Sequence, residues 1–227
     1  MKRKLTGLLL LALLACGTAE AQQAELNPAV DAWLAAQTSI QTWSADFMQT
    51  RKLKSLAQPL TKKGHLWFAA PDRFRWELGH PAQTIAVRSA DQMLIFYPLL
   101  KRVERFPLTG QQVGAWADAL NLLQAGFPRS RSELESRYDI LSQSVSGGVG
   151  KLVLAPKSAA ARRMMPQIEI DFDTQDHSLR GTELQFADGS TMRNDFSNAK
   201  LNPKVDETMF TPPVPADYKV TEPLAQH

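Results

Sequence analysis

Hydrophobic and polar residues alternate in many short runs along this chain, a pattern typical of β-strands. Turn residues such as Gly79-His80-Pro81 and Asp188-Gly189 separate the runs. Short strands at intervals of about 8 to 12 residues predict an antiparallel meander, as found in sandwiches and barrels. The predicted strands are 43–48, 64–69, 74–78, 84–88, 93–97, 103–106, 138–145, 151–155, 167–173, 179–186 and 191–199.

Two segments follow helical spacing instead. Asn27 can cap a helix and Pro28 suits its first turn, so we expect a short amphipathic helix that ends near Thr38. A second helix is predicted within 111–125, because apolar residues recur there along one stripe. The main positions of that stripe are Val113, Trp116, Leu120 and Leu123. Residues 132–137 fit neither pattern clearly, and the tail after Pro213 reads as extended chain.

No repeat, linker or shift in composition divides the chain after its first residues, so we expect a single domain over residues 22–227. Apolar residues make up 44% and charged residues 22% of the chain, which is ordinary for a globular protein and unlike a disordered one. The predicted fold class is therefore mainly β with few helices: one large, strongly curved antiparallel sheet, with one helix before it and one in its middle.

The first 21 residues read as a secretory signal peptide. Three basic residues precede the apolar run 5–15, which is too short to span a bilayer as a helix. Ala19 and Ala21 then supply the small residues that precede a cleavage site. Cleavage after Ala21 removes the three basic residues and Glu20, so it lowers the net charge from +3 to about +1. We therefore expect an exported, soluble protein that does not select a nucleic acid by its charge.

The single cysteine, Cys16, lies inside this segment. Cleavage after Ala21 would leave no cysteine, which excludes disulfides, thiolate zinc sites and cysteine nucleophiles from the mature chain. An alternative stays open, because Leu13-Leu14-Ala15-Cys16 resembles a bacterial lipobox, in which the cysteine is lipidated and becomes the first residue. In that case the protein would be anchored to a membrane.

The chain shows no recognisable arrangement of catalytic or metal-binding residues. The histidines are not spaced as metal ligands and read as surface residues: His65, His80, His177 and His227. Asp171, Asp173 and Asp176 lack the central glycine and closing glutamate of a calcium loop, and the first two read as the solvent face of a strand. We expect neither enzyme activity nor a metal or cofactor.

Apolar residues are more numerous on the predicted strands than one half-buried sheet face needs. In the first half, a common face is predicted for Leu66, Phe68, Phe74, Trp76, Ile85, Val87, Leu94 and Phe96, with Phe47 from the strand before them. In the second half, the corresponding set is Ile168, Ile170, Phe172, Leu184 and Phe186. Either these side chains fill a core, or they line a partly open apolar cavity with the helices as its lid. An exported protein without a visible active site favours the cavity, hence binding.

Several motifs occur in the order found in one family. The string Gly64-His65-Leu66-Trp67-Phe68-Ala69-Ala70-Pro71-Asp72-Arg73-Phe74-Arg75-Trp76-Glu77 is preceded by Phe47-Met48-Gln49. It is followed by Leu154-Ala155-Pro156-Lys157 and by Phe210-Thr211-Pro212-Pro213. From about Ser39 to Pro215 the chain resembles the LolA-type outer-membrane lipoprotein carriers.

This resemblance implies an unclosed β-barrel, or half-barrel, with a helical lid over its mouth. It also implies a monomeric periplasmic carrier that takes lipoproteins from an inner-membrane ABC exporter, holds their acyl chains, and passes them to an outer-membrane acceptor. The apolar residues named above would form the lipid-binding cavity, and Val113, Trp116, Leu120 and Leu123 would belong to the lid. Alternatives on the same fold are a carrier of free lipids or glycolipids and a lipid-sensing regulatory protein.

One position departs from the family pattern. Many members carry an arginine directly before the proline of the long motif, where it hydrogen-bonds the lid closed, but this chain has Ala70. An alanine side chain cannot donate such bonds, so the lid must be held differently.

We predict that the mature protein begins at Gln22. Mass spectrometry of the protein exported with its own signal peptide would show this N-terminus, and residues 1–21 would be absent. An N-terminal fragment that starts at a lipid-modified Cys16 would instead support a membrane-anchored protein.

Overall fold

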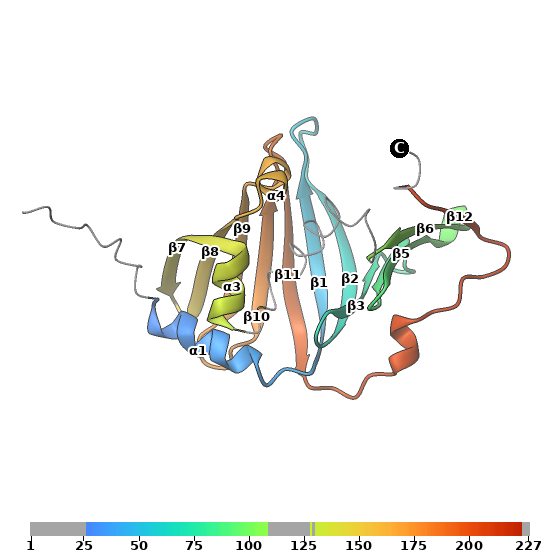
Figure 1. Ribbon diagram of the computed structural model, residues 1–227. Coiled ribbons are helices and arrows are strands. Elements are labelled where there is room, and N and C mark those ends of the chain that lie inside the picture. The colour runs from blue at the N-terminus through green and yellow to red at the C-terminus, as the bar shows by residue number, and fades with distance from the viewer. Residues whose placement is uncertain (1–25, 109–127, 129, 224–227) are drawn as a thin grey trace, which may run out of the picture.

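The structure is a computed structural model that describes residues 26–108, 128 and 130–223. Within this part of the chain, 12 strands form one curved, unclosed sheet (Figure 1). From edge to edge the order is β12-β6-β5-β4-β3-β2-β1-β11-β10-β9-β8-β7. The first half contains β1 (Thr42–Lys52), β2 (Leu60–Ala69), β3 (Arg73–Leu78), β4 (Thr84–Arg88), β5 (Gln92–Tyr97) and β6 (Arg102–Pro107). The second half contains β7 (Tyr138–Ser146), β8 (Val149–Pro156), β9 (Gln167–Asp173), β10 (Leu179–Gln185) and β11 (Thr191–Leu201), and β12 (Lys219–Thr221) follows near the C-terminus.

The sheet consists of two meanders that meet in the middle. Within each meander, successive strands pair antiparallel, as their alternating pattern predicts. The two meanders are joined by antiparallel pairing of β1 with β11, in which Phe47 lies opposite Phe196. One pairing differs from the prediction of an entirely antiparallel sheet: β12 lies parallel to β6. The tail that reads as extended chain therefore contains one of the two edge strands of the sheet.

Three α-helices lie in the described residues: α1 (Pro28–Gln37), α3 (Arg131–Arg137) and α4 (Ala159–Met164). The predicted start of α1 is confirmed, because the Asn27 side chain accepts a hydrogen bond of 3.0 Å from the backbone N–H of Ala29. The ambiguous segment 132–137 is helical, with Ser130 as its cap. Helix α4 is absent from our sequence prediction, because a helix of six residues is too short to show a period. Two short 3₁₀ helices, η1 (Pro98–Leu100) and η3 (Glu207–Phe210), complete the described elements.

The three α-helices lie against β7–β10, with α1 near the lower end of these strands and α4 near the upper end (Figure 1), and we call the face that they cover the inner face. The main core is there: Val30 and Trp33 of α1 and Leu134 of α3 are buried in one cluster with apolar side chains of β8 and β9. Trp33 stacks on Phe172 with 4.8 Å between the ring centroids. The helices thus supply the apolar cover that one face of this half of the sheet requires.

The prediction that all the apolar residues of the first half share one face is wrong for four of them. Residues directly opposite each other in an antiparallel pair point to the same side of the sheet. Since Arg88 lies opposite Phe74 and Ala86 lies opposite Trp76, the residues that alternate with them in β4, Ile85 and Val87, must point to the other, outer face. In β5, Leu94 and Phe96 lie opposite these outer-face residues of β4, so they point to the outer face as well. The outer-face residues are Ile85, Val87, Leu94 and Phe96.

The C-terminal tail packs against these four residues, of which Val87, Leu94 and Phe96 are buried and Ile85 is half-buried. They cluster with Val103 and with Val214 and Tyr218, which lie between η3 and β12. The sequence pattern did not separate the faces, because Ile85, Ala86 and Val87 are consecutive apolar residues and fit either side. This part of the sheet is therefore covered on its outer face by the tail.

The predicted solvent exposure of Asp171 is also wrong, although its predicted face is correct. Asp171 is buried on the outer face, where Arg193 Nη2 donates to its Oδ2 at 2.6 Å. Lys151 Nζ lies 3.6 Å from the other carboxylate oxygen. The buried carboxylate is tolerated because two cations pair with it, Lys151 from the neighbouring strand β8 and Arg193 from β11, which lies beyond β10.

Gly64 makes room for a ring in the middle of the inner face. A Cβ built on Gly64 would lie 2.1 Å from Cζ of Phe47 and 2.4 Å from the carbonyl oxygen of Glu77. The Phe47 ring uses this space to reach Trp76, with 4.2 Å between the ring centroids. Gly150 has the same relation to the Phe172 ring in the second half of the sheet.

We therefore expect Gly64→Ala to lower the free energy of unfolding by roughly 1–3 kcal/mol, the usual cost of overpacking a core. Urea unfolding followed by far-UV circular dichroism would measure it. Thr61→Ala on the same strand is the control, because the Thr61 side chain is exposed and its loss should change the stability by less than about 0.5 kcal/mol. Equal stability of Gly64→Ala and the wild type would contradict the described packing.

Candidate functional site

The inner face of the first half of the sheet carries an apolar surface that is only partly covered. Strand β3 supplies Phe74, Trp76 and Leu78, which alternate with the outer-face residues of the same strand. All three side chains are half-buried and pack against the main core. The same holds for Ala70, Ile140, Phe186 and Met192. This surface is continuous with the core, and an apolar ligand placed on it would be removed from water.

Phe47 lies at the centre of this surface. It is 2% exposed, and its ring contacts Trp76 on one side and Phe196 on the other, at centroid distances of 4.2 and 6.2 Å. Leu66 and Phe68 of β2 lie on the same face, opposite Trp76 and Phe74, and both are buried. The structure thus brings together the five first-half residues that remain of the predicted inner set.

The predicted residues of the second half are also on the inner face, but beneath helices. Ile168, Ile170 and Phe172 are 1% exposed or less and belong to the core under α1. Leu184 is buried in the same cluster, and Phe186 is half-buried at its border. The two predicted alternatives therefore apply to different halves of the sheet. The apolar side chains form a filled core on β8 and β9 and a partly covered surface on β3.

The predicted lid lies outside the described residues. Val113, Trp116, Leu120 and Leu123 fall in the segment 109–127. Ala70, where the family pattern has arginine, is half-buried beside the inner core, and its backbone N–H donates to the carbonyl of Gln41 at 2.7 Å.

A buried polar row crosses the inner face, and our sequence analysis did not single it out. Gln49 Nε2 donates to Oδ1 of Asn194 at 3.1 Å, and Asn194 Nδ2 donates to Oγ1 of Thr182 at 3.2 Å. Gln49 and Asn194 are buried, so these bonds satisfy amide groups that would otherwise be unpaired. The inward direction of Gln49 could have been predicted from the sequence, because Gln49 is two residues after Phe47 on the same strand and must point to the same face.

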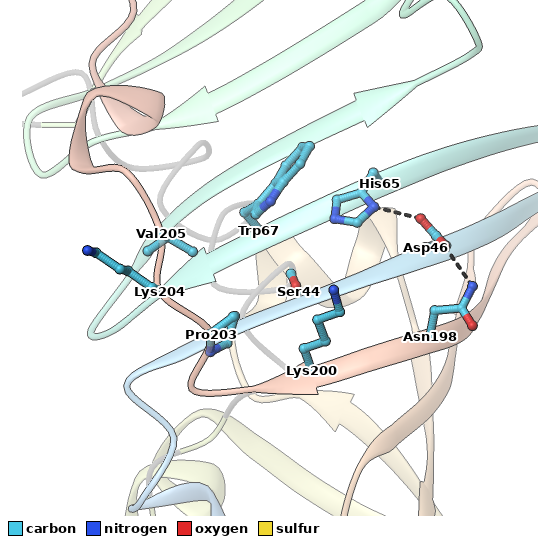
Figure 2. A pocket seen from close by; sticks show the side chains of 9 residues that line it. All are labelled: Ser44, Asp46, His65, Trp67, Asn198, Lys200, Pro203, Lys204 and Val205. Carbon is cyan, nitrogen blue, oxygen red and sulfur yellow. Dashed lines mark hydrogen bonds and ion pairs between the residues drawn. The ribbon is translucent and has the colours of Figure 1, made fainter.

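A separate pocket of about 330 Å³ lies on the outer face of β1, β2 and β11 (Figure 2). His65 Nδ1 lies 2.6 Å from Oδ1 of Asp46, and Asn198 Nδ2 donates to Oδ2 of the same carboxylate at 2.8 Å. The hydrogen bond with Asn198, followed in size by the one with His65, holds the pKa of Asp46 below its ordinary value. His65 is thus a half-buried, paired side chain and not the plain surface histidine that we expected. The lining residues are Ser44, Asp46, His65, Trp67, Asn198, Lys200, Pro203, Lys204 and Val205.

This pocket contains serine, histidine and aspartate, the residue types of a hydrolase triad. A triad requires the serine hydroxyl to be hydrogen-bonded to the histidine ring. In the described part of the chain, Ser44 makes no hydrogen bond to His65, although the histidine and aspartate are paired. The arrangement therefore explains how Asp46 is held, and we assign it no catalytic step.

The described residues contain no group of three or more His, Cys, Asp or Glu side chains that could hold a metal ion. Among the same residues, none of the helices has the length and apolar character needed to span a membrane.

Comparisons with known proteins agree with the motifs. Residues 38–213 match the family model described as "Outer membrane lipoprotein carrier protein LolA". The outer-membrane lipoprotein carrier protein of Chromohalobacter salexigens is 26% identical over 178 residues, which cover 78% of this chain and 79% of that protein. The carrier protein of Methylibium petroleiphilum is 26% identical over 206 residues, covering 90% of this chain and 92% of that protein.

Among solved structures, an uncharacterized conserved protein from Thermus thermophilus aligns with a TM-score of 0.49 and 10% identity, over 83% of this chain and 94% of that chain. The family match covers most of the chain and includes both meanders of the sheet. The chain belongs to the family of outer membrane lipoprotein carrier proteins named LolA.

Proposed function

We propose that this protein is a periplasmic carrier that binds the acyl chains of lipoproteins and moves them from the inner to the outer membrane. The observation that carries the proposal is the partly covered apolar surface around Phe74, Trp76 and Leu78, continuous with the core through Phe47. Family membership supports it, as do relatives named outer-membrane lipoprotein carrier proteins.

The physical requirement for such a carrier is large. Each CH₂ group transferred out of water gains about 0.8 kcal/mol, so acyl chains of ordinary length do not leave a membrane without an apolar site to receive them. Aromatic side chains such as Phe74 and Trp76 offer wide contact areas to alkyl chains. No covalent bond changes in this process, and the protein need only bind and release.

The binding surface that we propose consists of Phe47, Leu66, Phe68, Phe74 and Trp76, with Leu184 and Phe186 at its border. The proposed donor is an inner-membrane ABC exporter of lipoproteins, and the proposed recipient is an outer-membrane acceptor. A monomer that is free after cleavage at Ala21 would carry one cargo between them. Ala70 supports one alternative, a carrier of free lipids or glycolipids, because the chain lacks the arginine of the family motif.

We expect the purified protein, residues 22–227, to release newly made lipoproteins from spheroplasts as a soluble complex of one carrier and one cargo. Size-exclusion chromatography followed by immunoblotting would detect that complex. A control incubation without the carrier should leave the lipoproteins in the membrane fraction. If no complex forms while a fluorescent fatty acid still binds, the lipid-carrier alternative replaces the proposal.

We also expect Trp76→Glu to weaken the binding of a fluorescent fatty acid at least tenfold, because a carboxylate is unfavourable in an apolar site. The matched control is Trp67→Glu, since Trp67 is half-buried on the outer face of the neighbouring strand, opposite Arg75. This variant should bind the probe within about twofold of the wild type.

Circular dichroism must first show that both variants are folded. Equal affinity of the folded Trp76→Glu variant and the wild type would remove Trp76 from the binding surface. Equal weakening by both substitutions would mean that the effect is not specific to the inner face.

A further inference from the structure

An arginine with a largely covered side chain lies on the apolar inner face, next to the proposed binding surface. Arg88 is the last residue of β4, and it lies opposite Phe74 of β3 and opposite Met93 of β5. Directly opposite residues share a face of the sheet, so the Arg88 side chain is on the inner side between these two apolar residues. It is 11% exposed.

The guanidinium of Arg88 is only partly hydrogen-bonded. Its Nη2 donates to Oδ2 of Asp72 at 3.0 Å. Its Nε and Nη1 are buried, and neither has an acceptor among the described residues. A guanidinium carries five N–H groups, one of them on Nε and two on each terminal nitrogen. Most of the donors of this side chain are thus removed from water without a partner, which is unfavourable in a folded protein.

The positive charge of Arg88 is paired with a carboxylate, although most of its N–H groups have no acceptor among the described residues. Asp72 supplies one negative charge in direct contact with Nη2. Desolvation lowers the pKa of Arg88, Asp72 acts in the opposite direction, and the nearby positive charge of Arg137 lowers it further. An arginine nonetheless stays protonated in proteins. What the site lacks is therefore oxygen acceptors, and a neutral carbonyl can supply them.

The surroundings restrict what kind of molecule can bring those oxygens. Phe74 packs with both the main core and a smaller apolar cluster formed by Met93 and Phe106. Along β3 the inner face continues from Phe74 through Trp76 to Leu78, a distance of about 13 Å at the rise of a β-strand. A ligand that fits has an alkyl chain along β3 and a polar end with carbonyl oxygens at Arg88.

We propose that Arg88 is a polar anchor for the cargo, which donates hydrogen bonds to the ester or amide carbonyl oxygens at the head of the acyl chains. This inference rests on the proposed carrier function and adds an orientation to it. The carbonyl ends of the chains lie at the end of the sheet where β4 ends and the 70–72 turn contributes Asp72, and the methyl ends point toward Leu78.

The test compares two synthetic ligands that differ only in the carbonyl groups: a cysteinyl peptide with an ester-linked diacylglyceryl group and its ether-linked dialkyl analogue. Their affinities would be measured by displacement of a fluorescent fatty acid from the full mature chain. We expect the wild type to bind the ester about tenfold more tightly than the ether, as a hydrogen bond from a charged donor would give.

Arg88→Met should remove this preference by weakening the ester about tenfold and leaving the ether within about twofold. The double substitution Arg88→Met with Asp72→Asn should give the same ratio without an unpaired carboxylate, which keeps the test valid if the single variant folds poorly. Arg75→Met is the matched control, because Arg75 is on the outer face of β3 and is paired with Glu77. It should keep the wild-type preference.

An equal ester-to-ether ratio in the wild type and in Arg88→Met would overturn the anchor, while the carrier function would stand. If Arg88→Met weakened only the free fatty acid probe, Arg88 would bind a carboxylate and the carbonyl assignment would be wrong. If the wild type bound neither diacyl ligand nor fatty acid, the proposed function itself would fail and the anchor with it.

Discussion

The contact of the Phe47 ring with Trp76 and Phe196 holds the two halves of the sheet to one apolar face. Phe47 is on β1, and its ring lies over Gly64 of β2 to reach β3, while Phe196 approaches from β11. A single side chain thus spans four neighbouring strands. Leu66, Phe68 and Trp43 belong to the same cluster, so the aromatic surface of β3 and the core under the helices form one continuous apolar body.

The two halves of the inner face differ in what covers them. In the second half, α1, α3 and α4 cover the apolar side chains of β8 and β9, and Phe172 stacks on Trp33 of α1. In the first half, β3 leaves three large apolar side chains half-buried, while the tail covers the outer face of β4 and β5. Apolar side chains left partly in water favour any ligand that covers them, so the surface that we propose for binding and the filled core lie in different halves of one sheet.

Most of the strands could be predicted from alternation and turn residues, because both act locally along the chain. The faces were harder, since Ile85 and Val87 flank an alanine and could point either way until pairing across strands fixes the choice. The candidate site shows the same limit. Its aromatic residues were identifiable from spacing and from the family motifs, but the polar row from Gln49 through Asn194 to Thr182 joins different strands. Arg88 looked like an ordinary charged residue at the end of a strand, and only the assembled sheet places apolar neighbours beside it.

The pairing of β1 with β11 has a consequence for the time course of folding. β1 ends at Lys52 and β11 begins at Thr191, so the middle of the sheet is made from segments far apart in sequence. Contacts between distant segments form slowly, because a long loop must close before they bring any gain. In a chain that emerges N-terminus first, each meander can begin to pair early, but its centre must wait for nearly the whole polypeptide. During that interval β1 is an unpaired edge beside β2, and this is when a chaperone that shields exposed strands would matter most to this protein.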